Sequence, residues 1–254
     1  MKKRSILPLL ILTVCVSTFT VYGQINIYVG VKGGICIPNL SAGSGNENPL
    51  SNGYSSRTGG DFGVLATCQF NKWLAFQPEI IYSQQGGKHN GLQAIPDPYG
   101  PVPPYFYANF KNTAKLNYLL VPLMAKFDFR LQKKLNLYFN AGGFAGFLLS
   151  AKSVTKGNSY IYLDEMGQQP ASPLPQSFDS TDDIKSSVHK VNAGVIGAIG
   201  LSYQLGFGKI FIEGGGNYGF INIQKFKEDG KNYSGAATIH IGYLHALHSK
   251  KSIK

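Results

Sequence analysis

Strict alternation of apolar and polar residues is the feature that most constrains the fold of this chain. In residues 26–37, Ile27, Val29 and Val31 fall on one face and Lys32 falls on the other. A period of two residues is typical of β-strands with one apolar and one polar face. The pattern predicts eight strands, over residues 26–37, 58–70, 73–84, 115–129, 135–150, 189–205, 209–221 and 234–246.

The connections between these segments alternate between short and long. The short ones are 71–72, 130–134 and 206–208, and the long ones are 38–57, 85–114, 151–188 and 222–233. Transmembrane barrels sort their connections in this way, whereas soluble sandwiches have no reason to do so. We therefore expect an all-β fold, an eight-stranded antiparallel up-and-down transmembrane β-barrel. It would have long extracellular loops, short periplasmic turns and both termini in the periplasm.

The first 23 residues have the pattern of an export signal. Lys2, Lys3 and Arg4 precede the apolar run from Ile6 to Phe19, and Gly23 offers a small residue at the cleavage position. The run is shorter than the ~20 residues that a spanning helix needs. The sequence thus predicts a cleaved signal peptide over 1–23, a barrel domain over 24–247, a basic tail over 248–254, and export to the cell outer membrane.

Composition narrows the possible partners. Removal of the three basic residues of the signal lowers the formal net charge from +11 to +8. The remaining charges are scattered, so we expect outer-membrane lipid rather than nucleic acid as the partner of the basic side chains. Cys36 and Cys68 fall near opposite ends of neighbouring predicted strands, too far apart for a disulfide.

Aromatic residues lie near the predicted strand ends, where barrels carry interfacial girdles. They are Trp73 and the tyrosines 28, 54, 82, 107, 138, 203, 218 and 243.

The apolar strands form an ordered series of segments: Tyr28–Gly34, Phe62–Lys88, Leu116–Phe127, Ala141–Lys152 and Gly194–Ile223. This series resembles the PorT-type outer-membrane β-barrel family of the Bacteroidota. The resemblance implies an eight-stranded barrel, and the namesake of the family serves protein secretion and gliding. The sequence departs from the family pattern at its end, because His245 to Lys254 follow Tyr243 where such barrels finish on an aromatic residue.

Charged residues on the predicted inward face are the main candidate site. They are Lys32, Asp61, Glu79, Lys126, Asp128, Glu213 and His240. Isolated buried charges are costly, so opposite signs should pair across the lumen of a narrow barrel. We expect a structural polar cluster there; a narrow pore or a ligand site is the alternative.

Other motifs do not establish a catalytic, cofactor or metal site. Gly214–Gly219 matches G-x-G-x-x-G, but the following residues continue a strand pattern instead of starting a helix. His89 and His189 fall in different loops without a local nucleophile signature. Asp179, Asp182 and Asp183 lack the spacing of a calcium loop. We therefore expect no enzyme, no cofactor and no metal.

The predicted function is a structural or protein-interaction barrel, for example an accessory component of a secretion or surface machinery. Protein partners would bind through the long loops 38–57, 85–114 and 151–188, and the chain would be a monomer or a subunit of a membrane complex. The alternative is an outer-membrane enzyme or ligand-binding barrel that acts on envelope lipids.

Overall fold

The computed structural model describes residues 26–42, 48–96 and 105–247. The predicted signal peptide and the whole of the predicted basic tail lie outside these ranges. Apart from one short 3-10 helix, Lys227–Asp229, all regular elements of the described chain are β-strands. Among the described residues, no helix has the length and apolar character needed to cross a bilayer.

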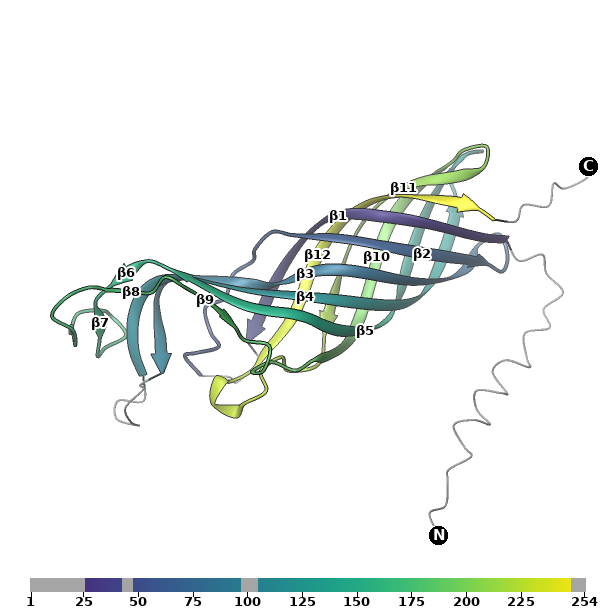
Figure 1. Ribbon diagram of the computed structural model, residues 1–254. Helices are drawn as coiled ribbons and strands as arrows, with labels where there is room; N and C mark the ends of the chain where they lie inside the picture. Colours follow the sequence, from purple (N-terminus) through teal and green to yellow (C-terminus); the bar gives the residue numbers. More distant parts are fainter. Residues whose placement is uncertain (1–25, 43–47, 97–104, 248–254) are drawn as a thin grey trace, which may run out of the picture.

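Eight long strands form a closed antiparallel ring (Figure 1). Each strand pairs with the next one along the chain, and β1 pairs with β12 from Tyr28↔Ala246 to Ala42↔Asn232. This confirms the predicted up-and-down barrel. The ring strands are β1 (Asn26–Ala42), β2 (Gly59–Gln69), β3 (Leu74–Pro96), β4 (Tyr105–Arg130), β5 (Leu135–Lys156), β10 (Val191–Gln204), β11 (Gly208–Gly219) and β12 (Asn232–Ala246).

The two ends of the barrel differ as the connection lengths predict. The short connections 70–73, 131–134 and 205–207 lie at the same end as the start of β1 and the end of β12, which we call the turn end. The long connections lie at the opposite end, the loop end. The antiparallel order puts successive connections at alternate ends, so the short connections share one end and the long ones share the other.

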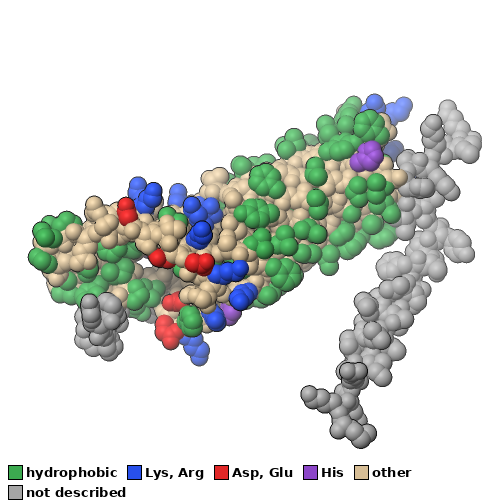
Figure 2. Space-filling model, in the orientation of Figure 1, with side chains coloured by type: hydrophobic (Ala, Val, Ile, Leu, Met, Phe, Trp, Pro, Cys, Tyr) green, Lys and Arg blue, Asp and Glu red, His purple; other side chains and the backbone are tan. Residues whose placement is uncertain are grey.

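The outer surface of the ring is apolar and the inner side is polar. Val31, Leu123 and Ile199 point outward and are 58, 54 and 58% exposed, whereas Lys32 and Glu79 on the inner side are buried. Hydrophobic side chains cover the visible face of the barrel in Figure 2. A continuous band of apolar side chains is costly in water and is stable in hydrocarbon, as in a transmembrane barrel.

The predicted loop over 85–114 is wrong in its larger part. Strands β3 and β4 continue as a paired ribbon to Pro96↔Tyr105, so only residues 97–104 are left, and they lie outside the described residues. Strand β5 likewise continues to Lys156 beside β4. One face of this ribbon is buried, as at Gln93, Ala108 and Phe110, and the other face is exposed. Polar residues and glycines share the buried face with the apolar residues, so the alternation that marks the ring fades there.

Short strands complete this outer region, which corrects the prediction of an unstructured loop over 151–188. We use the term projecting sheet for β3 from residue 85, β4 to residue 115, β5 from residue 151, and the short strands. These are β6 (Asn158–Ser159), β7 (Ile161–Tyr162), β8 (Gln176–Ser177) and β9 (Ser180–Asp183). In Figure 1 the sheet extends beyond the loop end of the barrel.

Two prolines interrupt the hydrogen-bond ladder on either side of β3. The β2–β3 register skips Pro78 and the neighbouring Gln77, and the β3–β4 register skips Pro122 and the neighbouring Val121. Proline has no N–H to donate, so the ladder is interrupted at each of these sites.

The aromatic residues predicted to form a girdle divide between the two faces of the wall, and the prediction is wrong for Tyr138. Tyr203 and Tyr218 point outward and are exposed, but Tyr138 is fully buried inside the barrel. Cys36 and Cys68 are both free, as predicted. They pair with Gly59 and Ile27, so nine residues, or about 30 Å of strand, separate them.

Candidate functional site

A cluster of ionisable side chains occupies the inside of the ring. Lys32 on β1 lies between two acids, with its Nζ 2.7 Å from Oε2 of Glu79 and 2.8 Å from Oε1 of Glu213. All three side chains are at most 3% exposed. One lysine thus joins strands β3 and β11 across the barrel, as the inward-face pattern predicts.

His240 on β12 extends the cluster. Its Nε2 lies 3.2 Å from Oδ2 of Asp61, and its Nδ1 lies 3.4 Å from Oε1 of Glu213. A carboxylate only accepts hydrogen bonds, so the Nε2–H of His240 donates to Asp61, while the contact of Nδ1 with Glu213 is longer. With a protonated His240, the charges of the cluster would balance, with Lys32, Lys126 and His240 opposite Asp61, Glu79 and Glu213.

Neutral side chains that the sequence analysis did not include complete the hydrogen bonding. The Tyr138 hydroxyl donates to Oε2 of Glu213 at 2.8 Å, and Gln77 Nε2 donates to Oε1 of Glu79 at 2.7 Å. Asn140 Nδ2 lies 3.5 Å from Glu213 Oε2. The sequence pattern assigned Tyr138 to an aromatic girdle, and the neutral side chains of Gln77 and Asn140 gave no reason to single them out.

Two of the predicted residues, Lys126 and Asp128, take no part in these ion pairs. Lys126 packs its Nζ 3.8 Å from the centre of the Tyr138 ring, a cation–π contact that links it to the cluster. Asp128 lies further toward the turn end, where its Oδ2 accepts from Gln69 Nε2 at 3.3 Å. The predicted cluster is therefore brought together except for Asp128. We name the assembled part, Lys32, Asp61, Glu79, Lys126, Tyr138, Glu213 and His240, the lumen cluster.

The projecting sheet is the second candidate. Strand β7 pairs with β4 through Tyr107↔Tyr162, and β9 pairs with β5 through residues 152–155. The rings of Phe110 and Phe178 stack with their centroids 4.7 Å apart and nearly parallel. This packing holds the chain after β5 against the ribbon, so the sheet is built by side-chain contacts as well as by backbone pairing.

The tip of the projecting sheet carries exposed apolar side chains. Met166 and Leu174 are 78 and 71% exposed, and Tyr160 and Leu163 are also exposed. Asp164 shapes the turn between them, because its carboxylate accepts hydrogen bonds from the backbone N–H groups of residues 166, 168 and 169. Hydrophobic side chains gather at the outer end of the sheet in Figure 2.

The histidines and aspartates outside the ring have ordinary partners. His89 packs against Tyr54, with ring centroids 5.9 Å apart, and burial lowers the pKa of its imidazole, which is therefore neutral at pH 7. His189 Nδ1 lies 2.8 Å from the Asn222 carbonyl oxygen, to which it donates.

The loop acids bond to nearby groups: Asp179 to the Gly157 N–H, Asp182 to the Ser180 hydroxyl and Asp183 to the Lys185 N–H. In the described part of the chain, no group of three His, Cys, Asp or Glu side chains is arranged so that it could hold a metal ion.

The closed ring, its apolar exterior and its charged interior define a transmembrane β-barrel of the kind found in outer membranes. A sequence model agrees: the chain belongs to the outer membrane protein beta-barrel domain family, whose model matches residues 21–225. The protein is therefore located in the outer membrane. None of the curated proteins matches the sequence.

Solved outer-membrane proteins share the general architecture at low similarity. The attachment invasion locus protein Ail of Yersinia pestis, in complex with the heparin analogue sucrose octasulfate, is 10% identical, with 87% of this chain and 99% of that chain covered and a TM-score of 0.38. Neisserial surface protein A is 13% identical, with 85 and 95% covered and a TM-score of 0.37. The outer membrane protease OmpT of Escherichia coli is 9% identical, with 88 and 96% covered and a TM-score of 0.27.

Proposed function

We propose that this protein is a non-enzymatic interaction barrel, in which the ring anchors the projecting sheet in the outer membrane and the sheet binds a protein partner. The partner would belong to a secretion or surface machinery, to which this chain is an accessory. The resemblance of the strand series to the PorT-type family supports this choice of machinery. In this proposal the lumen cluster is structural.

The observation that carries the proposal is the exposed apolar tip of the projecting sheet. Side chains such as Met166 and Leu174 are costly to expose outside the bilayer, and clustered exposed apolar side chains mark interaction sites. Strand pairing and the Phe110–Phe178 stack hold this tip in place, so little ordering entropy would be lost on binding. Methionine and aromatic residues are also enriched at protein interfaces.

The lumen cluster supports a structural barrel rather than a channel. The charged side chains of the cluster are all buried, and the fully buried rings and amides of Tyr138, Gln77 and Asn140 fill the space around them. An eight-stranded barrel has an interior only wide enough for side chains to fill. Ion pairs span the lumen at the height of the cluster, so the ring is a rigid support for the projecting sheet.

Purification from outer membranes tests the proposal. The protein carries a C-terminal tag and is extracted in mild detergent, and proteins that accompany it in stoichiometric amounts are identified by mass spectrometry. The triple variant Leu163→Ser, Met166→Ser, Leu174→Ser removes the apolar tip. We expect a partner with the wild type and its loss from the triple variant.

The matched control is Phe226→Ser, which removes an exposed apolar side chain between β11 and β12 outside the projecting sheet. This variant should keep the partner. A wild-type barrel that purifies alone, or a triple variant that keeps its partner, would contradict the proposal.

A further inference from the structure

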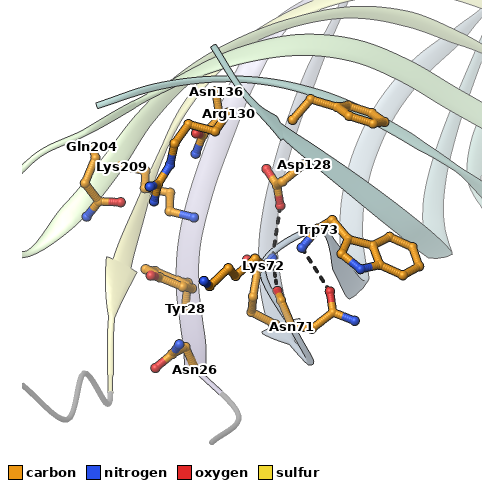
Figure 3. A pocket seen from close by; sticks show the side chains of 12 residues that line it. Asn26, Tyr28, Asn71, Lys72, Trp73, Asp128, Arg130, Asn136, Gln204 and Lys209 are labelled. Atoms are coloured by element: carbon orange, nitrogen blue, oxygen red, sulfur yellow. Dashed lines mark hydrogen bonds between the residues drawn. The ribbon is translucent and has the colours of Figure 1, made fainter. Parts of the chain in front are cut away.

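We propose that a pocket at the turn end of the barrel binds a small organic phosphate that also carries a hydroxyl group. The pocket has a volume of about 720 Å³ and opens beside the short turns, separate from the lumen cluster (Figure 3). Its size is in the range of small-molecule sites. The inference does not depend on the contacts proposed for the projecting sheet, which lies at the other end of the molecule.

Three cationic side chains from different parts of the fold line this pocket. Lys72 comes from the β2–β3 turn, Arg130 from the end of β4 and Lys209 from the start of β11. Figure 3 shows their charged ends around one space, with Tyr28 beside them. Within the described residues, none of the three forms an ion pair. Their mutual repulsion is relieved when an anion binds between them.

Lysine and arginine differ in what they contribute. Lys209 is held in place by the ring of Tyr28, whose centre lies 4.5 Å from its Nζ. Arg130 offers the planar fork that suits two oxygens of a phosphate, and the lysines add point charges. With Asp128, the pocket has three positive charges and one negative charge, a net charge of +2. A phosphate monoester, which carries nearly two negative charges at neutral pH, matches this charge.

Asp128 indicates that the ligand carries a hydrogen-bond donor besides its phosphate. The residue is 7% exposed, and its Oδ2 accepts from Gln69 Nε2, which also donates to the Asn71 carbonyl oxygen at 3.0 Å. Its Oδ1 is buried and has no hydrogen-bond partner among the described residues. A buried carboxylate oxygen that lacks a donor is costly. A ligand hydroxyl next to the phosphate would supply this donor.

Glycerol 3-phosphate is a probe with both groups, and inorganic phosphate is the matched probe without a carbon-bound hydroxyl. Binding is measured by isothermal titration calorimetry on the full barrel in a phosphate-free detergent. We expect saturable binding of glycerol 3-phosphate, weakened about ten-fold or more by Arg130→Gln or Lys209→Gln. The heat-modified electrophoretic mobility of each variant checks that the barrel is folded.

Two variants separate this site from diffuse attraction to a basic surface. Lys133→Gln removes a charge at the same end from a residue that does not line the pocket, and it should leave the affinity unchanged. Asp128→Asn should weaken glycerol 3-phosphate while inorganic phosphate binds as well or better. The proposal is overturned by absent or non-saturable binding, by an equal loss in Lys133→Gln, or by an equal effect of Asp128→Asn on both probes.

A soluble metabolite can supply the monoester and the hydroxyl, and a phosphatidylglycerol headgroup supplies the same two groups as a phosphodiester with a single negative charge. The titration is repeated with the barrel in nanodiscs that contain phosphatidylglycerol. If glycerol 3-phosphate no longer binds in these nanodiscs, the proposal holds and the lipid headgroup occupies the pocket. If its binding is unchanged, the proposal holds and the ligand is a soluble molecule.

Discussion

The ring and the projecting sheet are continuous in β3, β4 and β5, yet they are stabilised by different environments. In the ring, apolar side chains point outward and charges point inward, so the stability of this part depends on lipid outside and on ion pairs inside. In the projecting sheet, one face meets water and the other is covered, with Ala108 and Phe110 buried, and stability comes from strand pairing and a few aromatic contacts. The comparison teaches that exposure alone has no fixed meaning in this molecule: an exposed leucine is buried in lipid in one region and unprotected in the other.

The largest effect should come from breaking the charge balance inside the ring. Lys32→Met leaves Glu79 and Glu213 without their cation and should lower the free energy of unfolding by about 3–5 kcal/mol, measured by urea unfolding in lipid vesicles. Combining Lys32→Met with Glu79→Gln and Glu213→Gln removes the unpaired charges and should restore most of the loss. A single variant as stable as the wild type would show that the ion pairs are not structural.

The next effect separates lipid-facing from water-facing apolar residues. Leu123→Lys or Val195→Lys, both on the outer face of the ring, should cost about 2–4 kcal/mol of unfolding free energy near the midplane. Leu174→Lys, at a side chain even more exposed but on the projecting sheet, should change stability by less than about 0.5 kcal/mol. Equal costs at the two kinds of site would mean that the face assignment is wrong.

A smaller and local effect is expected in the projecting sheet. Phe178→Ala removes the stack on Phe110, worth about 0.5–1.5 kcal/mol beyond its buried area. Hydrogen exchange should become about ten-fold faster at the amides of β9 and stay unchanged in β10, because the sheet opens independently of the ring. Faster exchange in both would indicate one cooperative unit.

The smallest effect should come from the histidines at the loop end. Because His89 packs as a neutral ring and His189 bonds to a backbone carbonyl, we expect no change in envelope lipid composition in His89→Ala or His189→Ala. The measurement is mass spectrometry of extracted lipids. An altered lipid profile in either variant, with normal amounts of folded barrel, would favour an enzyme acting on envelope lipids.

The sequence predicts the ring well because the two faces of each ring strand meet different environments. Ile27, Val29 and Val31 face lipid while Lys32 faces the lumen, and this contrast is visible as alternation. The projecting sheet was missed because the contrast is weaker there: Gly91, Gln93 and Asn112 share the covered face with Ala108 and Phe110.

Only part of the lumen cluster was predicted from the sequence, because alternation gives incomplete information about a side chain. Alternation gives the direction of a side chain but not its height along the barrel axis or its partner across the lumen. Asp128 therefore shares the inner face with Lys126 but lies at the turn end. Tyr138 shares the inner face too, but as a tyrosine near a strand end it was assigned to an interfacial girdle.

The most direct test of the central claim, a membrane ring that presents the projecting sheet outside the cell, is cysteine labelling on intact cells. Met166→Cys at the tip and Lys133→Cys at the turn end are exposed to a membrane-impermeant maleimide, with the wild type, whose Cys36 is buried, as the background. The wild type also has the half-buried free Cys68, so labelling is read above this background. We predict labelling of Met166→Cys on intact cells and of Lys133→Cys only after the outer membrane is permeabilised. Labelling of Lys133→Cys on intact cells, with Met166→Cys protected until permeabilisation, would contradict the account.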